Sequence, residues 1–235
     1  MRRMIWIGRG DSQSTPWIDA ATDAGWRSMP LPLITKEPLP LDDRGRDCLD
    51  RLKEDDWIFL TSPFASRLFR EQCHDRAPSK IAVVGERTGL ELRPMTADLV
   101  ASGHGGAQLA MEYLKRGPIA DNIRHVHFTS EAPRKELHET LRNKGINIER
   151  IPAYRTTTID GPAPEIDDHT LLFSPSAAMS LAERCPIDVH HPVMAIGPTT
   201  AEAAKRLGFT VNLTLNEPTP SELTRELMQW ATTTT

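Results

Sequence analysis

Two Gly-x-x-Thr sequences, each directly after a short apolar run, are the residues of this 235-residue chain best suited to chemistry. They are Gly85–Thr88 after "IAVV" and Gly197–Thr200 after "VMAI". Glycine permits a tight strand-to-helix turn, and Thr88, Thr199 or Thr200 could cap the helix that follows. Because the exposed N–H groups and the helix dipole of such a turn attract anions, we predict two anion-binding turns.

Two further turns carry hydroxyl groups in the same arrangement. Thr61 and Ser62 stand in "TSP", and Ser174 and Ser176 stand in "FSPS". Serine can cap a helix, and the proline that follows suits its first turn. A single cap is more often structural than functional, whereas four such turns on the expected ligand side of the two domains favour an anion-binding cleft. The sequence has neither a G-x-G-x-x-G nor a G-x-x-x-x-G-K-[ST] pattern, so dinucleotide and nucleoside triphosphate binding lack their usual signatures.

The elements that would position these turns alternate between strand and helix. Short apolar runs followed by turn residues and helical patterns predict an open, parallel α/β sheet flanked by helices. One helix is expected over 133–143, ending at Lys144-Gly145. The predicted strands are Ile5–Ile7, Trp57–Leu60, Ile81–Val84, Val126–Phe128, Leu171–Phe173 and Val193–Ile196.

The turns repeat at a nearly constant spacing. "TSP" at 61–63 and "FSP" at 173–175 are 112 positions apart, as are Gly85 and Gly197. Gly25 and Gly145 follow at a spacing of 120. Repeated features in the same order indicate a duplicated α/β unit.

Two proline-rich stretches occupy equivalent places in this repeat and predict the domain borders. They lie in 31–41 and 151–166, which we interpret as extended linker strands. One domain then comprises 42–150, and the other combines 1–30 with 167–235. Two similar domains joined by two linkers predict a ligand cleft between them, since ligands gather beyond the carboxyl ends of parallel strands.

Composition excludes several function classes. A net charge of −4 argues against nucleic acid or an anionic membrane as the main partner. The apolar stretches are too short for a membrane span, and the first residues lack the core of a signal peptide. Three cysteines without metal or redox spacing indicate reduced thiols, so we expect a cytoplasmic protein. His190 and His191 suggest a metal site, but without partners at ligand spacing they are expected to be surface histidines, and no metal is predicted.

Several ordered motifs resemble the uroporphyrinogen-III synthase family. They are "DDWIFLTSPFAS" (55–66), "IAVVGERT" (81–88), "PAYRTT" (152–157), "LLFSPSAAMS" (171–180), "AIGPTTAEAAKRLGF" (195–209) and "PTPSEL" (218–223). The resemblance spans nearly the whole chain, and "AIGPTTA" followed by "PTPxxL" is its most specific part. It implies two α/β domains joined by a two-stranded linker, acting as a monomer without cofactor or metal.

The resemblance also implies a reaction. The family cyclises hydroxymethylbilane to uroporphyrinogen III, inverting ring D and losing water, in heme and siroheme biosynthesis. The substrate is a linear tetrapyrrole with acetate and propionate groups on every ring, passed on by hydroxymethylbilane synthase. Because the free substrate closes without inversion, the protein must hold its reactive ends, and such positioning is worth roughly 7–11 kcal/mol.

Individual residues match family positions. Tyr154, in "PAYRTT", either donates a proton to the departing hydroxide or only packs its ring against the linker. Arg9 and Arg134 are matched basic residues that could bind substrate carboxylates, the alternative being that both are solvated surface arginines, Arg9 beside Asp11. The other expected ligands are Thr61, Ser62, Thr88, Ser174, Ser176, Gly197, Thr199 and Thr200. Phe64 stands where the family can have a basic side chain, so fewer charges are expected beside "TSP".

Two alternatives belong to other classes. A cofactor-independent racemase would use paired thiols, but Cys73 and Cys185 lie about ten residues beyond their Ser-Pro turns, near the ends of the following helices. The second alternative, which the sequence does not exclude, is a non-enzymatic two-domain protein that closes on a small polycarboxylate. Analysis of the product isomers separates it from the enzyme.

Overall fold

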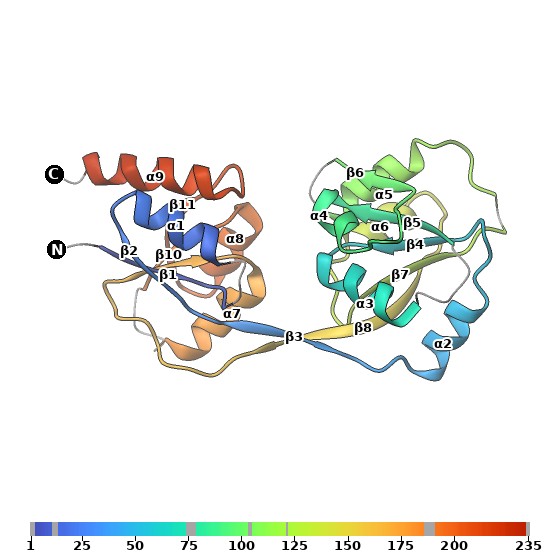
Figure 1. The fold of residues 1–235 in the computed structure, drawn as a ribbon, viewed down its shortest axis with the longest axis horizontal. Coiled ribbons are helices and arrows are strands. Elements are labelled where there is room, and N and C mark those ends of the chain that lie inside the picture. Colours follow the sequence, from blue (N-terminus) through green and yellow to red (C-terminus); the bar gives the residue numbers. More distant parts are fainter. Residues whose placement is uncertain are drawn as a thin grey trace. The chain divides into compact units, whose positions relative to one another are not determined.

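The computed structural model describes residues 3–10, 14–73, 79–102, 105–120, 122–185 and 191–233. The chain divides into two compact units. Unit 1 comprises Met1–Thr35 and Thr157–Thr235, and unit 2 comprises Lys36–Thr156. Each unit has its own sheet with helices on both faces (Figure 1). This is the predicted α/β fold.

The sheet of unit 1 has five strands in the order β11-β10-β9-β1-β2. All four pairings are parallel. The three central strands carry most of the buried side chains, which explains why their sequences are nearly continuous apolar runs. The strands are Met4–Ile7 (β1), Arg27–Pro30 (β2), His169–Leu172 (β9), Pro192–Ala195 (β10) and Thr210–Thr214 (β11).

Two helices cover each face of this sheet. Thr15–Asp23 (α1) and Pro220–Thr233 (α9) pack together over a core that includes Ile5 and Ile7. Pro175–Arg184 (α7) and Pro198–Arg206 (α8) lie on the opposite face over Leu172 and Val193. Figure 1 shows α9 running alongside α1. Alternating side chains of one strand thus feed two separate cores, as the strand period of two requires.

The sheet of unit 2 has six strands in the order β3-β8-β7-β4-β5-β6. One face carries α2, α3 and α4, and the other carries α5 and α6. The strands are Ile34–Pro38 (β3), Trp57–Leu60 (β4), Lys80–Val84 (β5), Leu99–Ala101 (β6), His125–Ser130 (β7) and Glu149–Thr158 (β8). The helices are Asp43–Asp50 (α2), Pro63–Cys73 (α3), Gly85–Leu90 (α4), Gly106–Leu114 (α5) and Glu136–Arg142 (α6).

The five strands of unit 1 correspond in order to five of the six strands of unit 2. Position for position, β11-β10-β9-β1-β2 corresponds to β6-β5-β4-β7-β8. The central strands Trp57–Leu60 and His169–Leu172 are 112 positions apart, and their following helices begin at Pro63 and Pro175, also 112 apart. The repeat predicted from the spacing of the turns therefore corresponds to a repeated topology. Unit 1 has the corresponding elements in a rotated chain order, that is, circularly permuted: the chain passes through β1 and β2 before β9, β10 and β11.

The predicted elements differ from the observed ones mainly at their ends. All six predicted strands are present, but the helix expected over 133–143 is shorter, Glu136–Arg142. Gly145 has a φ of 77°, as expected of a residue that ends a helix. In the predicted linkers, the strands are Ile34–Pro38 and Glu149–Thr158, so residues 159–166 contain no strand. Three of their eight residues are glycine or proline, which disfavour a strand.

Candidate functional site

Most of the predicted site residues of unit 2 stand at one edge of its sheet. Strands β5, β4 and β7 are adjacent and parallel, so their carboxyl ends share an edge. Thr61 and Ser62 follow β4, and Gly85 follows β5. Arg134, which is exposed, lies between β7 and α6, two residues before the helix begins. The topology thus places these segments beside one another.

Ser62 and Tyr154 form a hydroxyl pair at this edge. The Ser62 hydroxyl accepts a hydrogen bond from the Ala65 N–H at 3.1 Å, so Ser62 caps α3 as predicted. Its Oγ also lies 3.0 Å from the phenolic oxygen of Tyr154 on β8. The Tyr154 side chain is only 6% exposed. The helix cap therefore holds the hydroxyl of the predicted acid in place.

Two cations flank the aromatic ring that follows Ser62. The ring of Phe64 packs edge-on against Tyr154, with centroids 4.9 Å apart. The Lys36 Nζ lies 5.6 Å from the Phe64 centroid and 5.7 Å from that of Tyr154. The guanidinium carbon of Arg67 lies 4.9 Å from the Phe64 centroid. The three distances from a cation to a ring centroid are within cation–π range.

The expectation that this wall carries fewer charges than is usual in the family stays a prediction, although two cations do lie beside Phe64. The cations come from β3 and α3 instead of from position 64 itself. Sequence reasoning missed Lys36 and Arg67. Arg67 could have been found, because it lies one helical turn after Pro63 at the start of α3. Lys36 could not, since only the pairing of β3 with β8 brings it to Tyr154.

The Thr61 hydroxyl is bonded to a buried histidine. Its Oγ1 lies 3.0 Å from Nε2 of His127, and His127 Nδ1 lies 3.0 Å from Nε2 of His138 on α6. His127 is 1% exposed, and its pKa is lowered to about 3, first by burial and then by His138 and Arg150. Burial likewise lowers the pKa of His138, with Arg150 and Arg142 contributing. Both rings are thus neutral near pH 7.

The threonines of the Gly-x-x-Thr turns do not cap helices. Thr88 lies inside α4, and Thr199 and Thr200 lie inside α8, neither of which has a side-chain cap. Thr88 and Thr200 are each 3% exposed, whereas Thr199 is exposed. Each helix begins closer to its glycine than expected, so the threonine falls within the first turns of the helix.

The two glycines of these turns differ. Gly85 has a φ of 73°, a conformation that glycine adopts without strain, as predicted. Gly197 has a φ of 175°, which any residue can adopt, so the expected need for glycine is wrong there. A Cβ added at Gly197 would meet no atom within 4 Å. Neither the backbone nor the packing of Gly197 thus requires glycine.

In unit 1 the remaining predicted residues follow β1, β9 and β10, three adjacent parallel strands. Ser174 caps α7 by accepting from the Ala177 N–H at 3.1 Å. Ser176 lies within the first turn of α7 and is half-buried. The guanidinium of Arg9 lies 4.7 Å from the centroid of the Phe173 ring. The half-buried Arg9 is thus stacked against an aromatic side chain.

The histidines and cysteines that the structure describes do not form a metal or thiol site. His191 is fully buried beside the Thr170 hydroxyl at 2.9 Å, so the expectation of a surface histidine is wrong, and His190 lies outside the described residues. Burial raises the pKa of Cys73 to about 12 and also raises that of Cys185. Buried, protonated thiols are poor nucleophiles, which argues against the racemase. Within the described ranges, no three His, Cys, Asp or Glu side chains gather as a metal site would require.

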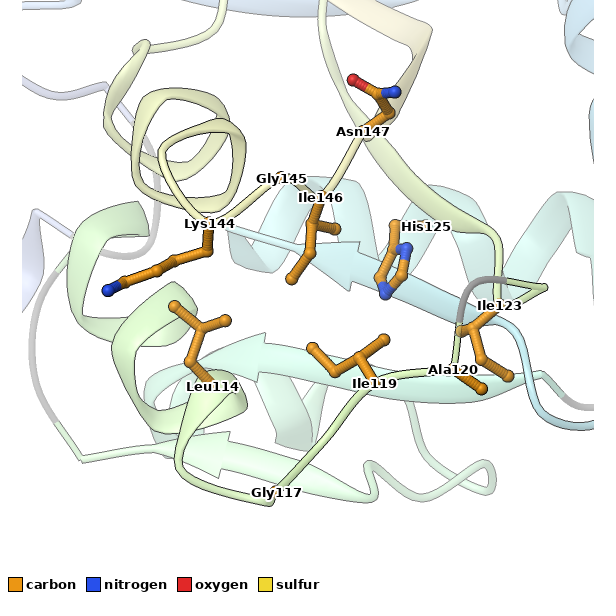
Figure 2. A pocket seen from close by; sticks show the side chains of 10 residues that line it. All are labelled: Leu114, Gly117, Ile119, Ala120, Ile123, His125, Lys144, Gly145, Ile146 and Asn147. Atoms are coloured by element: carbon orange, nitrogen blue, oxygen red, sulfur yellow. The ribbon is translucent and has the colours of Figure 1, made fainter.

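A cavity of about 390 Å³ lies elsewhere in unit 2 (Figure 2). Leu114, Ile119 and Lys144 line it, together with His125, the first residue of β7. It therefore lies at the amino end of β7, and none of the predicted site residues lines it. The buried Tyr113 hydroxyl lies 2.6 Å from Nε2 of His125.

Comparisons with known proteins agree on one family. A family model described as uroporphyrinogen-III synthase HemD matches residues 16–225. The crystal structure of uroporphyrinogen-III synthetase from Helicobacter pylori aligns over 98% of this chain and 100% of its own, with a TM-score of 0.65 and 14% identity. That of a mutant uroporphyrinogen III synthase from Thermus thermophilus aligns over 98% and 99%, with a TM-score of 0.63 and 15% identity.

At these identities the structural similarity speaks for the fold. No curated protein matches the chain. In the part of the chain that the structure describes, no helix is long and apolar enough to span a bilayer.

Proposed function

The chain belongs to the uroporphyrinogen-III synthase family, and from this premise we propose that it cyclises hydroxymethylbilane to uroporphyrinogen III. The observation that carries the proposal is the match of the family model over residues 16–225. The family makes the chain a lyase-type enzyme of tetrapyrrole synthesis. We propose more specifically that it is a hydro-lyase, which inverts ring D and releases one water.

The proposed reaction balances without a co-reactant. The bond between the hydroxymethyl carbon and its oxygen breaks, and the departing hydroxide takes a proton to become water. The resulting azafulvene is attacked by the substituted carbon of ring D, which gives a spiro intermediate. That intermediate fragments and recloses at the unsubstituted α-carbon of ring D, now reversed, and this carbon loses the proton that replaces the one given to the hydroxide. Most of the catalytic effect asked of the protein is positioning, together with donors aimed at the developing charge.

We assign the proton donation to Tyr154. A phenol can donate a proton to a leaving oxygen, and one held by a second hydroxyl is already oriented for donation. The 3.0 Å contact with Ser62 supports this assignment, because Ser62 can donate to the phenolic oxygen and leave the Tyr154 proton for the substrate. Packing of the ring against Phe64 supports the alternative that Tyr154 contributes only shape. Substitution of the hydroxyl alone decides between them.

Substrate carboxylates are the proposed ligands of the cations and donors at the strand ends. In unit 2 these include Lys36 and Arg67, whose contacts with the Phe64 ring beside Ser62 support their addition to the set. The predicted ligands Thr61, Ser62, Thr88 and Arg134 of unit 2 and Arg9, Ser174, Ser176, Gly197, Thr199 and Thr200 of unit 1 stay in the proposal. Among them, the burial of Thr88 and Thr200 leaves their hydroxyls the least accessible to a ligand. Action as a cytoplasmic monomer, with substrate handed over by hydroxymethylbilane synthase, also stays a prediction.

Isomer analysis tests the function. Freshly generated hydroxymethylbilane is incubated with and without the protein, the products are oxidised to porphyrins, and the type I and type III isomers are separated by chromatography. A catalytic, protein-dependent shift to type III is expected. Type I alone, with protein shown to be folded, would contradict the proposal and leave a protein that binds a polycarboxylate without turnover.

A further inference from the structure

Two histidines, the buried His127 and the half-buried His138, have no part in the mechanism above. His127 lies in the middle of β7, opposite Phe59 of β4, and shares a sheet face with Phe59 and Thr61. On this face α6 covers the sheet and contributes His138, which is half-buried. The side chains of His138, His127 and Thr61 form one continuous line of hydrogen bonds, which runs from α6 through β7 to the carboxyl end of β4.

While His127 is neutral, the hydrogen bonds of this line can run from donor to acceptor in only two directions. A neutral imidazole has one N–H, so one ring nitrogen donates and the other accepts. If His138 donates to Nδ1 of His127, then Nε2 carries the proton and donates to Thr61 Oγ1. If Nδ1 carries the proton, Nε2 must accept from the Thr61 hydroxyl. The first arrangement leaves the Thr61 proton available, and the second consumes it inside the protein.

An anionic ligand distinguishes the two arrangements. A carboxylate accepts hydrogen bonds and needs a donor, which Thr61 supplies only in the first arrangement. We propose that His138 and His127 are positioning residues that hold the Thr61 hydroxyl as a hydrogen-bond donor for a carboxylate of the substrate. This proposal rests on the proposed function, because it takes the ligand at Thr61 to be a polycarboxylate.

The surroundings of His127 support a fixed neutral ring. Its charged and titratable neighbours are His138 on α6 and Arg150 on β8, and both disfavour a second proton. Arg142 on α6 acts in the same sense on His138. With the cation excluded, the position of one proton decides the direction of the whole line. Because a buried polar group without its partner is costly, the line switches as a unit.

Two nearly isosteric variants of His138 give opposite predictions. In His138→Gln the side-chain amide can still donate to His127 Nδ1, so the line keeps its direction. In His138→Glu the ionised carboxylate only accepts, which favours the proton on Nδ1 and turns the Thr61 hydroxyl inward. We expect the KM for hydroxymethylbilane to be about tenfold higher or more in His138→Glu than in His138→Gln, the loss expected for one hydrogen bond to a charged group. The kcat is expected to change less.

Nitrogen-15 NMR of the histidine rings in the free protein tests the cause directly. His127 is expected to carry its proton on Nε2 in the wild type and in His138→Gln, and on Nδ1 in His138→Glu. A wild-type proton on Nδ1, or no transfer to Nδ1 in His138→Glu, overturns the proposal. So does transfer without a change in KM.

A matched control lies two residues away. His125 points to the same face of β7 and is bonded to the Tyr113 hydroxyl at 2.6 Å, so Tyr113→Phe breaks an equivalent buried pair outside the proposed line. This variant is expected to leave both KM and the His127 spectrum unchanged, and a rise in KM here would overturn the proposal as well. If wild-type protein forms no type III isomer, the proposed function fails, whereas the ring spectra still report the direction of the line.

Discussion

Replacing Tyr154 by phenylalanine removes one oxygen and keeps the ring against Phe64. The lost contact is the 3.0 Å hydrogen bond with Ser62, whose net contribution to the free energy of unfolding is about 1 kcal/mol. Ser62 still accepts from Ala65, so the cap of α3 survives. We therefore expect a folded variant with a small loss of stability. If the phenol is the acid, kcat should fall at least about 100-fold.

The energetic part of this prediction has an internal control. Ser62→Ala removes the helix cap together with the bond to Tyr154, which sums to about 2 kcal/mol. Ser174→Ala removes only the equivalent cap of α7, at the same 3.1 Å, and is expected to cost about 1 kcal/mol. Native-state hydrogen exchange measures both, because it reports the opening of each unit separately.

The assay for Tyr154→Phe is the rate of type III formation at saturating hydroxymethylbilane, which reads kcat without the contribution of binding. A kcat equal to that of the wild type removes Tyr154 from the mechanism and leaves it a packing residue. Equal costs for Ser62→Ala and Ser174→Ala would refute the contribution assigned to the hydroxyl pair.

Three further predictions concern other residues. Gly197→Ala should change the free energy of unfolding by less than about 0.5 kcal/mol, since the added Cβ meets no atom within 4 Å. It should nevertheless weaken substrate binding, because the methyl group blocks the start of α8. Calorimetry checks the stability, and a KM measurement checks the binding. Lys36→Met and Arg67→Met should each raise KM and reduce its salt dependence, whereas unchanged values would mean that these cations only stack on Phe64. Burial lowers the pKa of His191 from 6.5 to about 4. Between these pH values the unfolded state binds more protons than the folded state, so the free energy of unfolding should fall as the pH drops from 6.5 to 4. In His191→Gln the unfolding free energy from urea titrations should depend less on pH between 6.5 and 4.

The sequence predicts the parts of this fold that short-range patterns determine. Buried parallel strands are apolar runs such as Trp57–Leu60, and Ser62 and Ser174 cap helices as their Ser-Pro context indicates. The edge strands β2, β6 and β11 were missed, because β2 and β11 are largely exposed and lack an apolar run, and the apolar run of β6 is only three residues long.

The site was harder to predict, because it depends on pairings between distant segments. Lys36 reaches Tyr154 across more than 100 residues of sequence, through the neighbouring strands β3 and β8. His127 meets Thr61 only because β4 and β7 are adjacent. The misplaced threonine caps had a local cause: each helix begins before its threonine, and a Gly-x-x-Thr pattern does not reveal that start.

The rotated chain order of unit 1 has a consequence during synthesis on the ribosome. β1 emerges first and can pair with β2 through α1, but its other neighbour, β9, is encoded 164 positions later, where Ile5 faces His169. At about 5–20 residues per second, the open edge of β1 waits on the order of 10–30 s, while the whole of unit 2 is translated. An unpaired apolar edge is a template for pairing with other chains. Unit 2, whose sheet from β4 to β8 is encoded without interruption, can complete that sheet before β9 is made. The nascent amino-terminal segment is thus where this chain is most exposed to misassembly and most in need of a chaperone.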